Sequence, residues 1–96
     1  IIQDLVDIGA DAINAQLFCM DIEELGRSFR GKVTFWGEID RQFVLPFGTE
    51  ENVRHAVRRV HRALGSREGG LIAQASWTVS DPTENILTVF DEWSKF

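Results

Sequence analysis

The sequence has little of several features that usually indicate a class of protein. Its single cysteine, Cys19, excludes an intrachain disulfide and is typical of a reducing cytoplasm, where we expect the protein to act. No apolar run approaches the ~20 residues that cross a bilayer, so we expect no membrane partner. The net charge of −5 offers no basic surface for a phosphate backbone, which argues against a nucleic-acid partner.

What is present is the composition of a globular domain. The 96 residues are 44% hydrophobic and 26% charged, which is enough for one small domain. Residues 1–8 already carry the apolar spacing of a helix, and Gly9 supplies a stop. Since no initiator Met or basic leader precedes Ile1, we expect the chain to be truncated at its N-terminus.

Three apolar runs alternate with helical patterns and predict strands. The runs cover residues 12–18, 33–39 and 70–76, and residues 40–48 predict a loop. Strands that are separated by full-length helices are parallel and are joined by right-handed crossovers. We therefore expect the order α-β-α-β-α-β-α around a parallel sheet.

Sequence signals mark where three helices begin. Asp21 and Glu24 predict a capping box, Thr49 caps the longest helix, and Asp81 is expected to cap the last helix with Pro82 at its first position. The longest helix has one continuous apolar stripe, made of Val53, Ala56, Val57, Val60, Ala63 and Leu64. The last helix is expected to bury Ile86, Leu87, Val89, Phe90 and Trp93.

The polar residues of the longest helix predict a solvated surface. Its basic group consists of Arg54, Arg58, Arg59 and Arg62. Arg54 lies four residues after Glu50, a spacing that favours an ion pair on a helix. The two histidines, His55 and His61, are expected to be exposed.

Alternation along each predicted strand separates an apolar face from a polar one. The polar faces contain Asn14, Gln16 and Phe18, then Thr34, Trp36, Glu38 and Asp40, then Gln74 and Ser76. Their polarity rises toward the C-terminal end of each strand, as in a barrel interior that opens into a site, whereas doubly wound strands are usually apolar on both faces. We therefore predict an α/β fold that forms the three C-terminal βα units of a (β/α)₈ TIM barrel.

Several segments resemble, in order and spacing, the C-terminal part of the uroporphyrinogen decarboxylase superfamily. These segments are residues 14–20, 29–40, 45–51, 70–74 and 82–86. Gly37-x-Ile39-Asp40 resembles the Gly-Asn-Leu/Ile-Asp signature on the penultimate strand of that superfamily. The resemblance covers essentially the whole chain and implies that residues 1–96 are the C-terminal part of a uroporphyrinogen decarboxylase-like barrel domain.

The resemblance also implies an activity for the full-length protein. The superfamily contains decarboxylases of porphyrin biosynthesis and methyltransferases that take methyl groups from corrinoid proteins. We therefore expect an enzyme that acts on a tetrapyrrole-linked substrate, with corrinoid-dependent methyl transfer preferred over uroporphyrinogen decarboxylation, and we expect this segment alone to be inactive. The expected partner is a small molecule or a corrinoid protein, and the full-length protein could form a homodimer.

Two departures from the superfamily keep a non-catalytic barrel remnant or binding module as an alternative. The decarboxylases resemble Gly-His-Gly at the end of the last strand, where this chain has Gln74-Ala75-Ser76. Zinc-dependent members place a cysteine ligand on that strand, and residues 70–96 contain none. A zinc ion would therefore need ligands upstream of Ile1. No cofactor is expected for decarboxylation.

Glu38 and Asp40 are the candidate catalytic residues. They stand at the C-terminal end of the second strand, where barrel enzymes assemble their sites. An i,i+2 pair on a strand points both carboxylates to one side, which suits proton transfer. The alternative is that one carboxylate caps the next loop by accepting backbone N–H bonds. None of the site-facing positions is Arg or Lys, although a decarboxylase would need cations to anchor its substrate.

The candidate substrate-binding residues are Gln16, Trp36, Gln74 and Ser76. The two amides, Gln16 and Gln74, could hold a carboxylate or could satisfy each other. Trp36 could stack on a flat macrocycle or could fill the core. Cys19 is a weak candidate for a metal ligand, with a buried and unreactive thiol as the alternative.

Overall fold

The computed structural model describes residues 1–96 as a mixed α/β chain with one three-stranded parallel sheet. The strands are β1 (Ala12–Asn14), β2 (Thr34–Gly37) and β3 (Leu71–Ala73), in the spatial order β1-β2-β3. Ile13 pairs with Phe35, and Phe35 with Leu71. The predicted parallel strands and their sequence positions are confirmed, although each strand is shorter than its apolar run.

The helices are α1 (Ile2–Asp7), α2 (Ile22–Phe29), α3 (Val44–Phe47), α4 (Glu50–Leu64) and α5 (Thr83–Trp93). A 3₁₀ turn, η1 (Leu17–Cys19), follows β1 where the sequence predicted more strand. The short α3 occupies part of the predicted loop at residues 40–48 because its Leu45 is fully buried. No helix is both long enough and apolar enough to cross a membrane.

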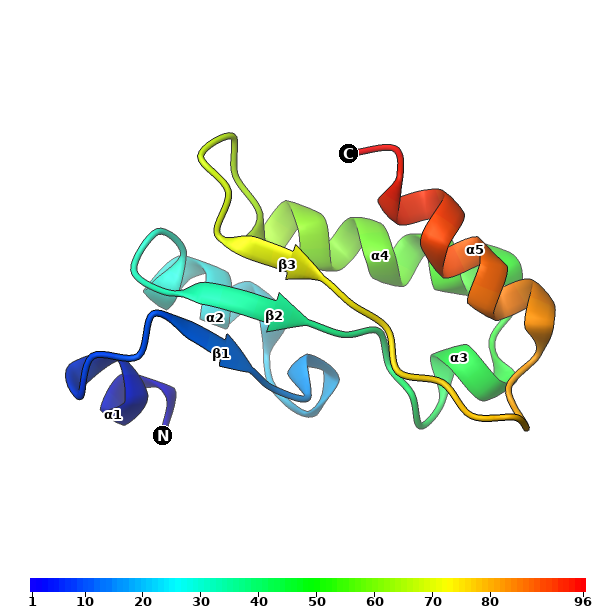
Figure 1. Ribbon diagram of the computed structural model, residues 1–96, viewed down its shortest axis with the longest axis horizontal. Coiled ribbons are helices and arrows are strands. Elements are labelled where there is room, and N and C mark those ends of the chain that lie inside the picture. Colours follow the sequence, from blue (N-terminus) through cyan, green and yellow to red (C-terminus); the bar gives the residue numbers. More distant parts are fainter.

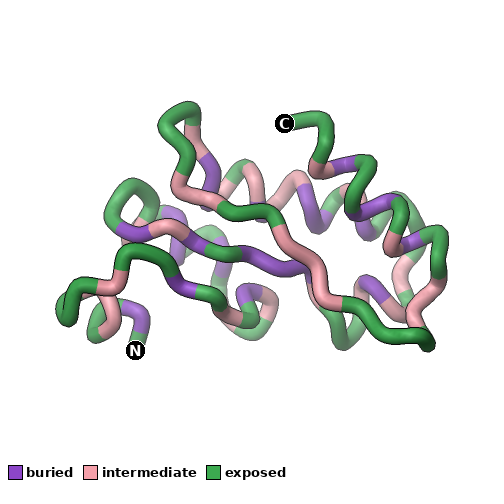
Figure 2. The backbone as a smooth tube through the Cα atoms, in the orientation of Figure 1, coloured by how far each residue is buried: buried purple, intermediate pink, exposed green.

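Helices α2 and α4 lie behind the sheet and form the core with it (Figure 1). The predicted stripe of α4 is confirmed: Val53, Val57 and Val60 are fully buried, together with Phe35 of β2. Figure 2 shows buried segments along β2 and α4, and exposed ones in the turns and at both chain ends. Gly26 of α2 lies so close to α4 that an added Cβ would collide with the carbonyl oxygen of Ala63. The glycine therefore permits the close packing of the two helices.

The front of the sheet carries no helix (Figure 1). Asn14, Trp36 and Ile72 lie in register across its three strands on this face. Trp36 is 43% exposed and Ile72 is 44% exposed, whereas the residues of opposite parity, Ile13 and Phe35, are buried. The predicted parity is confirmed for the covered face. Trp36 therefore lies outside the core that these residues form, and its place in a barrel core or at a ligand stays a prediction.

The caps of α2 and α4 follow from short-range hydrogen bonds. The Asp21 carboxylate accepts the Glu24 backbone N–H at 3.1 Å, as predicted. The reciprocal half of that capping box is missing because the Glu24 carboxylate binds Arg27 and Ser28 instead. On α4, Thr49 caps as predicted, and its box is completed by the side chain of Asn52.

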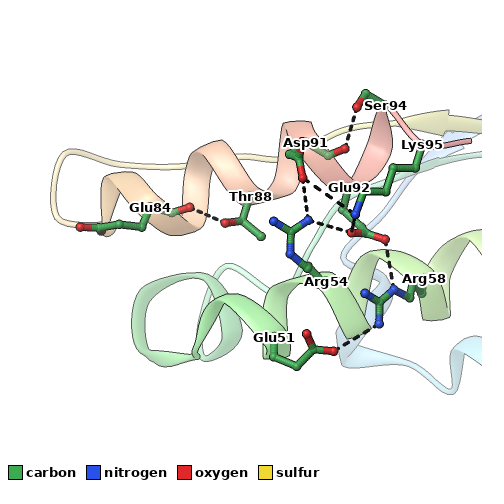
Figure 3. A network of polar contacts seen from close by, with 9 residues as sticks. All are labelled: Glu51, Arg54, Arg58, Glu84, Thr88, Asp91, Glu92, Ser94 and Lys95. Carbon is green, nitrogen blue, oxygen red and sulfur yellow. Dashed lines mark hydrogen bonds and ion pairs between the residues drawn. The ribbon is translucent and has the colours of Figure 1, made fainter.

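Helix α5 differs from its prediction because it packs on α4 through polar groups. Its buried residues are Asn85, Thr88, Val89 and Glu92, whereas Leu87 and Phe90 are exposed. Arg54 of α4 donates to Asp91 and Glu92 and not to Glu50, because α5 brings two carboxylates within reach (Figure 3).

The start of α5 also lies one residue later than predicted. Its N-cap position is Pro82, and no side chain caps the helix. Asp81 does not cap because its carboxylate accepts the Thr78 backbone N–H at 2.8 Å in the preceding turn. The Asp81-Pro82 signal therefore predicts the start of the helix to within one residue, but the predicted capping bond from Asp81 does not form.

Candidate functional site

Polar side chains gather at the carboxyl ends of β1 and β2. Gln16, Cys19, Glu38 and Asp40 line one cavity of about 30 Å³ together with Arg41. That volume is room for about one or two water molecules. Four residues that the sequence placed near a site are therefore brought together, and the i,i+2 pair of carboxylates does face one cavity.

Glu38 is the most buried carboxylate of this group. It is 6% exposed and accepts no hydrogen bond from the chain. Its ion-pair partner is Arg41, with Nε 4.0 Å from Oε1. Neither of its oxygens is fully enclosed, so water in the cavity can supply the hydrogen bonds that the chain does not. Packing alone gives no reason for a carboxylate at this position.

Asp40, unlike Glu38, accepts hydrogen bonds from the backbone. Its Oδ1 accepts the backbone N–H groups of Gln42 at 3.0 Å and Phe43 at 3.1 Å. These two bonds close the turn that leads into α3. The loop-capping alternative therefore holds for Asp40, and the free carboxylate of the pair belongs to Glu38.

Arg41 was missed by the sequence analysis, which expected no Arg or Lys to face the site. It lines the cavity because the Asp40 turn folds the chain back over the end of β2. The signal that could have found it is the Asp-Arg-Gln order directly after the strand, since an Asp at such a point often closes a turn.

Cys19 is exposed, so the expectation of a buried thiol is wrong. Its Sγ donates a weak hydrogen bond to Oε1 of Gln16 at 3.5 Å. No group of three or more His, Cys, Asp or Glu side chains is arranged to hold a metal ion.

The other candidate residues lie apart from this cavity. Gln74 accepts a hydrogen bond from Asn14 at 3.0 Å on the uncovered face of the sheet, so it does not pair with Gln16. Trp36 lies in register with Asn14 on the same face. Ser76 follows β3, and Trp36, Gln74 and Ser76 line neither the cavity at Glu38 nor the larger one beside it.

A larger open cavity of about 580 Å³ adjoins the first, because Phe18, Asp40 and Phe43 line both. Its other walls are Val44, Phe47 and Gly48 on one side and Asn52, His55, Ala56 and Arg59 of α4 on the other. The sequence alone gave no prediction of this cavity. Phe43 and Phe47 stand four residues apart, a spacing that places two side chains on one helix face, but the segment was interpreted as a loop.

A paired cation closes one end of this larger cavity. Arg59 donates to both carboxylate oxygens of Glu23, at 2.6 and 2.7 Å, and lies 5.8 Å from the ring centroid of Phe18. The hydrogen bond from Arg59 lowers the pKa of Glu23 from its ordinary value of 4.5 to about 2. The same bond raises the pKa of Arg59, so the guanidinium stays charged and held in place.

No protein-family model, no curated protein and no solved structure matches this chain. The class that the fold defines is a three-stranded parallel α/β unit with one covered sheet face.

Proposed function

We propose that the chain forms the last βα units of a (β/α)₈ barrel enzyme of the uroporphyrinogen decarboxylase superfamily. Three features support the proposal: the sheet is parallel, only one of its faces is covered, and the outer sides of β1 and β3 have no strand partner. Parallel sheets are normally buried on both faces. The polar residues gather at the carboxyl ends of the strands, where barrel enzymes build their sites.

The buried carboxylate of Glu38 is the observation that carries the proposed activity. It is 6% exposed, lacks a hydrogen bond within the chain and lines a cavity of solvent size. A carboxylate that faces a water-sized cavity and is not held by hydrogen bonds within the chain is placed to exchange a proton with a ligand. Glu38 would exchange a proton with the substrate, and Asp40 would hold the turn that shapes the cavity.

Methyl transfer from a corrinoid protein is the preferred reaction. The acceptor would give its proton to Glu38 as its lone pair takes the methyl group, and the electron pair of the broken bond would stay on the corrinoid. Trp36 and Gln74, with Ser76 as a lesser contact, would meet a tetrapyrrole on the uncovered face of the sheet, and Gln16 would contact the acceptor. A corrinoid would supply the methyl group, and zinc would need ligands outside the segment, with Cys19 as the only local thiol.

Decarboxylation is the second candidate, and Arg41 is the observation that favours it. A cation beside the cavity could anchor a carboxylate of the substrate, with Glu38 returning a proton to the carbon from which CO₂ departs. A barrel remnant that only binds its ligand is the third candidate. It predicts the same ligand contacts without any role for the Glu38 proton.

Tetrapyrrole binding tests the proposal directly on this chain. Visible difference spectra would be recorded on adding hydroxocobalamin or uroporphyrin to the wild-type chain and to Trp36→Phe, Gln74→Ala and Glu68→Gln variants. We expect binding that weakens about fivefold or more in the first two variants, since stacking and hydrogen bonds of about 1 kcal/mol each are lost. Glu68→Gln, in an exposed turn at the opposite end of the strands, is the matched control.

The outcomes separate the candidates. Binding of neither tetrapyrrole, or equal binding by all variants, would contradict the proposal. A preference for the corrinoid supports methyl transfer, and a preference for the porphyrin supports decarboxylation. In the full-length protein, loss of turnover in Glu38→Gln with unchanged ligand affinity supports an enzyme, and unchanged turnover would rule out the assigned role of Glu38.

A further inference from the structure

The larger cavity has two chemically different walls. One wall is aromatic, because Phe43 is 67% exposed, Phe47 is 81% exposed and Phe18 lies beside them. The other wall is polar and is made by Asn52, His55 and Arg59 of α4. The volume of about 580 Å³ lies within the range of small-molecule sites.

We propose that this cavity binds a planar aromatic monocarboxylate. The site shares Phe18, Asp40 and Phe43 with the cavity at Glu38, but Phe47, Asn52 and Arg59 line only the larger cavity. The inference therefore goes beyond the proposed function and does not depend on the Glu38 proton.

The aromatic wall explains the planar part of the ligand. Phe43 and Phe47 are both more than half exposed and leave apolar ring area in water. A ligand that covers these rings removes that area from water, which favours binding. A flat aromatic ligand can lie against both rings in offset or edge-on geometry. A narrow aliphatic chain would leave most of the ring area in water.

The polar wall offers N–H donors and therefore favours an acceptor on the ligand. The Oδ1 atom of Asn52 already accepts the Thr49 backbone N–H at 2.9 Å, which leaves its NH₂ group as the part without a partner in the chain. Arg59 uses Nε and Nη2 for Glu23, which leaves Nη1. His55 is exposed and has no hydrogen bond within the chain.

The charges of the wall limit how much negative charge the ligand can carry. Arg59 is paired with Glu23, and Asp40 adds a second carboxylate, so the three charges (+1, −1 and −1) sum to −1. This sum disfavours a doubly charged phosphate. The attraction for one carboxylate comes from the N–H donors of Arg59 and Asn52 that have no partner in the chain, and not from the net charge.

Naphthoate, a planar aromatic monocarboxylate, is the test ligand for this cavity. Naphthylmethanol, which has the same ring system without the charge, is the control ligand. Amide-resolved NMR titration of the whole chain is expected to show naphthoate shifts at Phe43, Phe47 and Asn52, with about tenfold weaker binding of the alcohol. Phe47→Ala is expected to weaken naphthoate about fivefold or more. Phe90→Ala, another half-exposed phenylalanine outside the cavity, is the control and should bind as the wild type does.

Further variants separate charge from packing. Arg59→Gln should weaken naphthoate and leave the alcohol unchanged, and Glu23→Gln, which keeps the cation, should bind naphthoate at least as tightly as the wild type. Shifts confined to the uncovered sheet face, equal binding of acid and alcohol, or no effect of Phe47→Ala would overturn the proposal. Glu38→Gln should leave naphthoate binding intact, so a failure of this site is distinguishable from a failure of the proposed function.

Discussion

Asn14 donates a hydrogen bond to Gln74 at 3.0 Å across the middle strand of the sheet. Asn14 is the last residue of β1 and Gln74 directly follows β3, and β2 lies between the two strands. The bond forms because both side chains stand on the uncovered face and reach over β2 from opposite sides. A polar bridge on this face, next to an exposed tryptophan, is typical of a surface that meets solvent or a ligand, and distinguishes it from the core face.

The Glu38→Gln substitution is expected to stabilise the chain. It keeps the shape of the side chain and removes a buried charge that has only Arg41 at 4.0 Å as a partner. We expect the free energy of unfolding to rise by about 1 kcal/mol, as measured by urea denaturation. A Glu68→Gln control at an exposed turn should change it by less than about 0.5 kcal/mol. A clear loss of stability in Glu38→Gln would show that the carboxylate is satisfied in the folded state.

Because of the ion pairs of Glu92, we expect the free energy of unfolding to fall in acid. Its side chain is 3% exposed and binds Arg54, Arg58 and Lys95 (Figure 3). Hydrogen bonds from Lys95 first and then from Arg54 lower the pKa of Glu92 from 4.5 to about 2. Because the folded pKa is the lower one, the stabilisation is complete above 4.5 and is lost as the pH falls toward about 2.

The matching variant is Glu92→Gln. At neutral pH it is expected to lower the free energy of unfolding by about 3 kcal/mol, because three cations lose their carboxylate. Denaturation series at several pH values should show this difference shrinking as the pH falls below about 4.5. Glu84→Gln, on the same helix without an ion pair, should cost less than about 1 kcal/mol. A Glu92→Gln deficit that is independent of pH would refute the electrostatic explanation.

The Gly26→Ala substitution is expected to destabilise the chain, although alanine favours helices. Helix propensity alone predicts a gain of about 1 kcal/mol. In the structure the new Cβ would collide with the carbonyl oxygen of Ala63, a backbone atom that cannot move aside cheaply. We expect a net loss of about 1–3 kcal/mol by thermal or urea denaturation. A gain would mean that α2 and α4 can separate at no cost.

Asn85 is expected to be the polar residue that fixes the start of α5. Its Nδ2 donates to the carbonyl oxygens of Leu45 and Gly48, both at 2.9 Å, and its side chain is buried. Asn85→Ala should lower the free energy of unfolding by about 2 kcal/mol. Asn85→Asp should be at least as harmful, since a carboxylate cannot donate to two carbonyl groups. An aspartate variant as stable as the wild type would contradict this role.

Local sequence signals predicted much of the framework. The Asp21 and Thr49 caps, the stop at Gly9 and the apolar stripe of α4 all depend on contacts within a few residues, so they can be recognised without knowledge of the fold. Strand parity likewise predicted the covered face, because alternate side chains on a strand must point in opposite directions. The barrel itself stays a prediction, since the three strands define a parallel sheet and no more.

The misjudged parts depend on contacts between distant residues. The sequence predicted that Leu87 and Phe90 are buried, but the contact of α5 with α4 is centred on Glu92 and two arginines more than thirty positions away. The sequence also left open whether Glu38 or Asp40 caps the next loop. The turn after β2 shows that Asp40 does so.

Short-range hydrogen bonds and the periods of helix and strand thus determined, from the sequence alone, where the three strands and the long helices lie and which strand faces are apolar, but not the short α3 or the turn η1. Only the tertiary structure decided that Glu38 is buried without a hydrogen bond and that Phe43 and Phe47 face Arg59 across a cavity. The physical reason is that burial and charge pairing depend on which surfaces the folded chain brings together. These contacts join residues that the local patterns treat as unrelated.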